Sequence, residues 1–125
     1  MITFADTNAL IAFVLKDRSF QRAAVTEHVE HNGPLVVSES ILAETYWVLV
    51  RTYAQDPVEV AQALRQLLFS STFRAWDADV AHAALVLLVR QPSLGLPDCL
   101  LVARAELGDA VFTFDRRLPA TIEQL

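Results

Sequence analysis

The sequence predicts an α/β fold in which helices cover both faces of a mostly parallel sheet. Three observations support this prediction. The chain has 125 residues, of which 54% are hydrophobic, so we expect residues 1–125 to form one domain around one core. Short apolar runs alternate along the chain with longer segments of helical spacing. The runs are mostly apolar rather than alternating, although Thr3 interrupts the first, and this is typical of parallel strands buried on both faces.

Four of the apolar runs are predicted as strands. They cover residues 2–5, 34–37, 72–76 and 110–114. The first run stops at Asp6 and the last stops at Asp115. Because ligands of open parallel sheets bind outside the carboxyl ends of the strands, we expect both carboxylates at one edge of the sheet.

Segments with helical spacing fill the chain between these runs. They cover residues 9–15, 19–31, 38–53, 57–69, 79–90 and 98–108. Residues with short polar side chains precede or open several of these helices and can cap them: Asp6, Ser38, Asp56 and Asp77. Gly33 and Gly108 mark helix ends. The ten residues after Asp115 are expected to hold a short helix and at most an edge strand.

The composition excludes several classes of protein. The longest unbroken apolar runs have seven residues, far below the roughly 18 that a membrane span needs. No basic segment precedes Asp6, so we expect no secretory signal. A single cysteine, Cys99, cannot form an internal disulfide. We therefore expect a cytoplasmic protein with no membrane contact.

The charge balance also bears on the choice of partner. Fifteen acidic residues outweigh ten basic ones and give a net charge of −5, which argues against a uniformly basic surface for nucleic acid. Divalent cations bound by some of these carboxylates would offset much of the negative charge. The balance is thus compatible with a metal-dependent enzyme that acts on phosphates.

Four carboxylates stand out by their positions: Asp6, Glu44, Asp98 and Asp115. Each aspartate lies next to the start of an element, where capping would also explain it. Glu44 lies between Ile41 and Val48 at helical spacing, so we expect it on or beside the buried face, held by a salt bridge or a metal. Together the four can reach one end of the sheet and offer the oxygen ligands that Mg²⁺ or Mn²⁺ prefers.

The remaining metal-binding residue types offer no competing site. His28 and His31 are expected on a solvated helix face, and His82 is expected to be half-exposed. Cys99 is expected in the core as a small apolar residue. None of these residues has the spacing of a zinc site.

Four motifs of this sequence resemble those of PIN-domain ribonucleases, particularly the VapC-type toxins of bacterial toxin–antitoxin pairs. The first is Asp6-Thr7-Asn8 after the first strand. The second is residues 40–49, SILAETYWVL, with Glu44 as its acid. The third is residues 96–105, LPDCLLVARA, and the fourth is residues 113–118, TFDRRL. The motifs follow the order of the family over residues 2–118, and only the short tail departs from it.

This resemblance implies a three-layer α/β/α sandwich with a central, mostly parallel sheet, and metal-dependent hydrolysis of RNA. It implies Asp6 and Asp98 as the principal ligands of Mg²⁺ or Mn²⁺, completed by Glu44 and Asp115 directly or through water. Thr7, Asn8 and Thr113 would support these ligands. Arg116 and Arg117 would contact substrate phosphate, unless they are merely solvated.

The resemblance also implies a homodimer and a cognate antitoxin protein. Several aromatic residues fall in or beside the two central helices, and we expect some of them to form an exposed patch for these partners: Tyr46, Trp47, Tyr53, Phe69, Phe73 and Trp76. An antitoxin arginine inserted among the acids would inhibit the enzyme.

Two other classes of function stay open. A catalytically silent interaction module would use the same acids as caps and ion pairs. A phosphotransfer domain of the receiver type also gathers aspartates at a sheet edge, but it resembles this chain less because the only lysine is Lys16, far from the last strand. A phosphatase of the haloacid-dehalogenase type would have a second aspartate where this chain has Asn8.

Overall fold

Two of the predicted strands pair in parallel, and the N-terminal segment of the chain lies beside them. The computed structural model describes residues 1–118, 123 and 124. Strand β1 (Leu35–Val37) pairs in parallel with β2 (Phe73–Ala75), with Val36 opposite Arg74. The N-terminal segment adds a parallel bridge from Phe4 to Val36, in which the Ala5 amide donates to the Val36 carbonyl at 2.8 Å. Both named strands are short and are largely buried, as continuous apolar runs predict.

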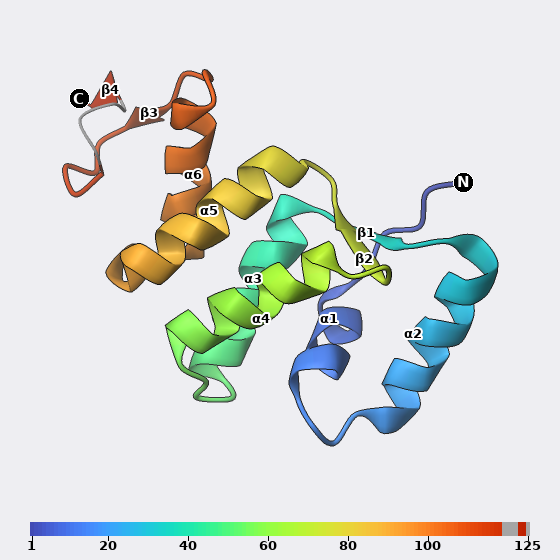
Figure 1. Cartoon of the computed structure of the whole chain (residues 1–125). Helices are drawn as coiled ribbons and strands as arrows, with labels where there is room; N and C mark the ends of the chain where they lie inside the picture. The colour runs from blue at the N-terminus through green and yellow to red at the C-terminus, as the bar shows by residue number, and fades with distance from the viewer. Residues whose placement is uncertain (119–122, 125) are drawn as a thin grey trace.

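A second pair of strands lies at the opposite end of the molecule (Figure 1). Strand β3 (Phe112–Thr113) pairs in parallel with β4 (Glu123–Gln124). Within the described residues, β3 makes no ladder with β1 or β2. The expectation that Asp6 and Asp115 end strands of one shared sheet edge is therefore wrong, because the last strand takes its partner from the tail of the chain.

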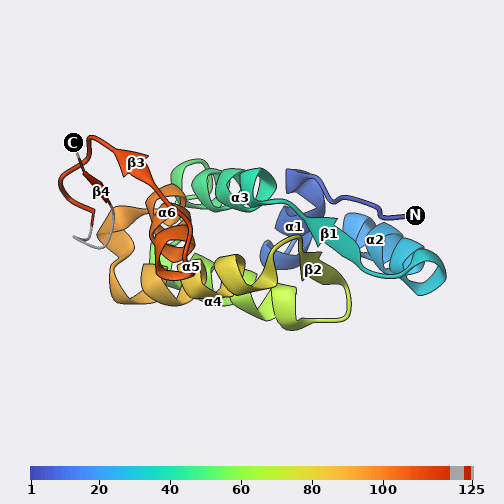
Figure 2. The same cartoon turned by 90° about the horizontal axis from the view of Figure 1, so that it is seen from above.

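Helices make up most of the structure and lie on both sides of the strands (Figures 1 and 2). Their bounds are α1 (Thr7–Val14), α2 (Ser19–Asn32), α3 (Glu39–Arg51), α4 (Pro57–Phe69), α5 (Ala78–Arg90) and α6 (Leu96–Glu106), with a short 3₁₀ helix, η1 (Pro92–Leu94). Helix α4 packs on β2 and on α5, α5 packs on α6, and α3 contacts α1, α4 and α6. The predicted α/β fold with parallel strands is confirmed.

The predicted caps are confirmed at four helix starts. Side-chain oxygens of Asp6, Ser38, Asp56 and Asp77 accept hydrogen bonds from backbone amides in the first turns of α1, α3, α4 and α5. Helix α6 differs from the prediction because it begins at Leu96, which places Asp98 inside its first turn. Gly95 precedes it with φ = 76°, a conformation that favours glycine.

The core holds these helices in place and thereby positions the candidate site. Leu42, Tyr46 and Leu49 form the buried stripe of α3 and pack with Leu64 and Leu85 in one apolar cluster. This stripe fixes which side of α3 faces outward.

The C-terminal tail contains the expected edge strand. Residues 116–118 form a turn, and β4 at Glu123–Gln124 is an abbreviated strand of the kind that the short tail suggested. A short helix was also expected in this tail, of which residues 119–122 and 125 lie outside the described residues.

Candidate functional site

Asp6 is held by the first helix that follows it. Its Oδ1 accepts a hydrogen bond from the Ala9 amide at 2.9 Å, and the side chain remains exposed. Asn8, in the first turn of α1, is also exposed. Asp6 therefore has a structural role as a cap and still faces solvent.

Thr7 connects this first motif to the second. Its hydroxyl donates a hydrogen bond to Glu44 Oε2 at 3.0 Å and so joins α1 to α3. Glu44 is exposed, so the expectation that it lies on or beside the buried face is wrong. The reason is that the fully buried polar position of α3 is Thr45, whose hydroxyl donates to the Ile41 carbonyl at 2.7 Å. Glu44 precedes Thr45 by one residue, so its side chain leaves the helix in a different direction and is exposed to solvent.

The third and fourth motifs meet through an arginine. Arg117 Nη2 donates to Asp98 Oδ2 at 3.4 Å and forms a close ion pair with Asp115 Oδ2. Its Nε donates to both carboxylate oxygens of Asp115, at 3.0 and 3.1 Å. The side chains of Asp98 and Asp115 are 25% and 28% exposed. Two half-buried acids that lie far apart in the sequence thus share one cation.

Hydrogen bonding also fixes the backbone around Asp115. Its amide donates to Thr113 Oγ1 at 3.0 Å, and the Arg117 amide donates to Asp115 Oδ1 at 2.9 Å. The hydrogen bonds from Arg117 lower the pKa of Asp115 to about 2. Asp115 is therefore ionised at neutral pH. Arg116, the other arginine of the motif, is exposed.

Two features of the structure were not predicted from the sequence. Arg104 of α6 forms ion pairs with Glu39 at 2.9 Å, Asp77 at 2.9 Å and Asp109 at 3.5 Å, and it ties α3, α5 and α6 together. Asp77 thus adds this ion pair to its capping role. The pairs join residues up to 65 positions apart, so sequence spacing gives no signal for them.

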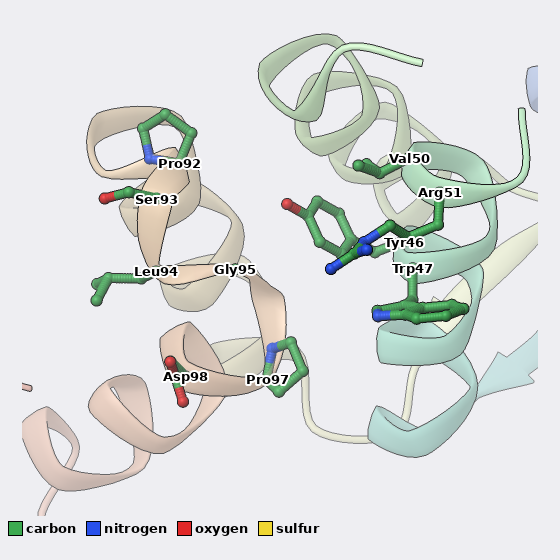
Figure 3. Close-up of a pocket in the computed structure, with 10 residues that line it drawn as sticks. All are labelled: Tyr46, Trp47, Val50, Arg51, Pro92, Ser93, Leu94, Gly95, Pro97 and Asp98. Carbon is green, nitrogen blue, oxygen red and sulfur yellow. The ribbon is translucent and has the colours of Figure 1, made fainter. Parts of the chain in front are cut away.

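The second feature is a groove next to Asp98 (Figure 3). One wall comes from α3, and the other comes from residues 92–98. Trp47 and Arg51 face this groove from consecutive turns of α3. Their spacing of four positions in the sequence indicates that they are neighbours on the helix surface, and this pattern could have pointed to the groove.

The other expectations for reactive residues are confirmed. His28 and His31 are exposed on α2. His82 is half-buried and stacks on Phe69 with ring centroids 4.1 Å apart. Cys99 is fully buried, and burial raises the pKa of its thiol to about 12.

Comparison with known families identifies the fold. The model of the PIN domain family matches residues 3–123, which is nearly the whole chain. The chain belongs to the PIN domain family. PIN domains are usually nucleases that act on RNA or DNA, and they generally use divalent metals. The α/β structure with parallel strands agrees with the three-layer α/β/α fold of this family. No curated protein matches the chain.

The PIN domain structure brings two of the four acids to one cation, and it leaves Glu44 and Asp6 apart from that pair. Asp98 and Asp115 form one group around Arg117, and Glu44 forms the other with Thr7, the neighbour of Asp6. Within residues 1–118, 123 and 124, no three acidic, histidine or cysteine side chains form a ready metal cluster. The residues nevertheless fit a divalent ion in their chemistry, since Asp98 and Asp115 already flank a positive group and offer only oxygen donors. Also in the described part of this PIN domain, no helix is long and apolar enough to cross a membrane.

Proposed function

We propose that this PIN domain is a metal-dependent endoribonuclease and the toxin of a toxin–antitoxin pair. The observation that carries the nuclease proposal is the approach of Asp98 and Asp115 to one cationic group. A pair of half-buried carboxylates held around a guanidinium has the charge and donor type to hold Mg²⁺ or Mn²⁺ in its place. We further propose that Asp6 and Glu44 complete the site, directly or through water.

The divalent ion would supply an activated water and would stabilise charge on the phosphate during hydrolysis of the P–O bond. The residues of the chain would prepare this reaction. Thr7 would hold the Glu44 carboxylate in one orientation through its 3.0 Å hydrogen bond. Thr113 would fix the backbone that carries Asp115. Arg117, once released from the two carboxylates, would be a donor for a phosphate oxygen, because guanidinium groups pair well with phosphate. Asn8 of the first motif and Arg116 of the fourth are also exposed. Asn8 would support the metal ligands, and Arg116 would contact substrate phosphate.

The nuclease proposal is tested by cleavage of RNA in Mg²⁺ or Mn²⁺. Asp6→Asn and Asp98→Asn should each abolish cleavage and leave the fold intact. Asp56→Asn is the matched control, because Asp56 caps α4 as Asp6 caps α1 but belongs to no motif of the site. Wild-type cleavage rates in either site variant would contradict the assignment.

A catalytically silent interaction module is the second candidate, and one observation favours it. Arg117 already forms ion pairs with two of the four acids, as it would in a module that uses them only in this way. A titration with Mn²⁺ distinguishes the two candidates. The nuclease should bind Mn²⁺ and melt at a higher temperature in its presence, because a ligand of the native state stabilises that state. The silent module should show neither effect at neutral pH.

The toxin role rests on the likeness of the four motifs to VapC-type toxins and on exposed aromatic surface. Of the six aromatic residues considered for partner binding, Trp47, Tyr53, Phe69 and Trp76 are exposed, whereas Tyr46 and Phe73 are buried. We propose that part of this surface, at Tyr53 and Phe69, binds a second copy of the chain and a small antitoxin in the cytoplasm. Light scattering of the isolated chain tests the homodimer, and co-expression with the neighbouring reading frame tests the antitoxin. A harmless monomer that binds no neighbouring product would contradict the toxin role and leave the nuclease standing.

A further inference from the structure

The groove beside Asp98 has walls of different character. One wall consists of Tyr46, Trp47, Val50 and Arg51 on α3, and the other of residues 92–95, Pro97 and Asp98. The groove has a volume of about 320 Å³. In Figure 3 the side chains of α3 face the 92–98 segment across an open space. Apolar rings, a guanidinium and a carboxylate therefore meet in one depression.

The α3 wall presents an aromatic ring with a cation beside it. Trp47 is 54% exposed, although its neighbour Tyr46 is buried in the core. The Arg51 guanidinium lies over the indole, 5.4 Å from the ring centroid. A tryptophan and an arginine arranged in this way stabilise each other by a cation–π contact, in which the guanidinium lies over one face of the indole.

The opposite wall connects this aromatic ring to the proposed metal site. Asp98 lines the groove and also pairs with Arg117, so the groove adjoins one of the two carboxylates that share this arginine. Gly95 adopts φ = 76° in this wall and presents no side chain to the groove. A nucleic acid with a phosphate near Asp98 would therefore have its next nucleotide within the groove.

We propose that this groove binds one unpaired base of an RNA substrate, which stacks on Trp47 while Arg51 contacts the adjacent phosphate. The proposal rests on the proposed nuclease function and assigns the base-stacking role to Trp47 and the phosphate contact to Arg51. Aromatic rings that accept stacked bases, together with cations that contact the backbone, are the usual features of single-strand binding. The mixed polar and apolar lining suits a base better than a wholly apolar protein segment.

The chain contains two tryptophans, which makes the proposal directly measurable. Trp76 follows β2, packs on Phe4 at a centroid distance of 5.6 Å and is 61% exposed, so it matches Trp47 in type and exposure but does not line the groove. In a Trp76→Phe background, all tryptophan fluorescence comes from Trp47. A short single-stranded RNA added in EDTA, where cleavage cannot proceed, should quench this fluorescence, and an RNA duplex of the same length should not.

Affinity for the same RNA gives a second readout. Trp47→Leu should weaken binding about tenfold, as expected for the loss of one stacked base. Trp47→Phe should restore part of the affinity, and Trp76→Leu should leave it unchanged. Arg51→Gln should lower the slope of log affinity against log salt by about one, because one phosphate contact is lost. Circular dichroism checks that each variant is folded.

Several outcomes would overturn the base site. One is unchanged RNA affinity in folded Trp47→Leu, and another is an equal loss in Trp76→Leu. Quenching of Trp47 by the antitoxin but not by RNA would make the groove a protein-binding surface instead. In each of these cases the cleavage test with Asp6→Asn and Asp98→Asn still decides the nuclease function independently. A wild-type chain that neither binds nor cleaves RNA would reject both proposals.

Discussion

Asp6 combines a structural role and a proposed functional role in one side chain, and two substitutions separate them. Its Oδ1 caps α1 through the 2.9 Å hydrogen bond from the Ala9 amide. Asparagine caps helices about as well as aspartate, so Asp6→Asn should change the free energy of unfolding by less than about 0.5 kcal/mol. Asp6→Ala removes the cap and should lower it by about 1 kcal/mol. In a chain of 125 residues, that loss corresponds to a fall in Tm of about 4 °C.

Function should respond differently to the same two substitutions. Asparagine has no charge to hold a divalent ion, so both Asp6 variants should lose Mn²⁺ binding and RNA cleavage. Urea denaturation without metal measures stability, isothermal titration measures Mn²⁺ binding, and an RNA assay measures cleavage. Asp56 provides the control, since its Oδ2 accepts from two amides at 3.1 Å in α4. Asp56→Ala should lose stability but keep both activities.

Two results would refute this reasoning about Asp6. If Asp6→Asn and Asp6→Ala destabilise the chain equally, the charge rather than the capping oxygen supports α1. If Asp6→Asn binds Mn²⁺ and cleaves RNA as the wild type does, Asp6 is a cap and nothing more.

Three further predictions follow from other contacts. Arg117→Gln should raise the pKa of Asp115 from about 2 toward its ordinary 3.8, which carboxyl NMR can measure, and should tighten Mn²⁺ binding. The same two results from Arg116→Gln would contradict the role of the ion pair. The pKa of His82 is lowered because burial disfavours its charged form, so the free energy of unfolding should fall as the pH drops below about 6.5. In urea titrations, His82→Phe should remove that part of the loss of stability at low pH. Leu49 is fully buried in the core, so Leu49→Ala should destabilise the chain by about 2–5 kcal/mol; a loss under about 1 kcal/mol would show that the core around α3 is poorly packed.

Features that depend on near neighbours in the chain could be predicted from the sequence. The caps at Asp6, Ser38, Asp56 and Asp77 are confirmed because a capping side chain reaches amides only two or three residues ahead. Three of the four strands expected from apolar runs form, whereas residues 2–5 form only a bridge at Phe4. The helices followed from their spacing, which is also a local pattern. Membership of the PIN family agrees with the order of the four motifs.

Glu44 shows where the local pattern was insufficient. Its spacing to Ile41 and Val48 suggested a buried position, but both of those neighbours are only half-buried. The buried stripe runs instead through Leu42, Tyr46 and Leu49, with Thr45 buried beside it, and this leaves Glu44 exposed. Which of two adjacent apolar stripes faces the core depends on the packing of α1 and α4 against α3, which the pattern of one helix does not contain.

The relation between Asp98 and Asp115 depends on contacts of still longer range. The sequence suggested a common sheet edge, yet β3 pairs with β4 rather than with β1 or β2. The two carboxylates approach each other instead because Arg117 contacts both. Like charges this near would repel without an intervening cation, so the guanidinium keeps the pair together in the metal-free chain. A divalent ion between Asp98 and Asp115 would compensate their negative charge more fully, because it carries two positive charges and the guanidinium carries one. Val102 of the third motif and Leu118 of the fourth pack in one buried apolar cluster, so apolar packing rather than pairing with β1 or β2 joins the two motifs. Arg117 then compensates charge between the two acids, and a metal must compete with it for both.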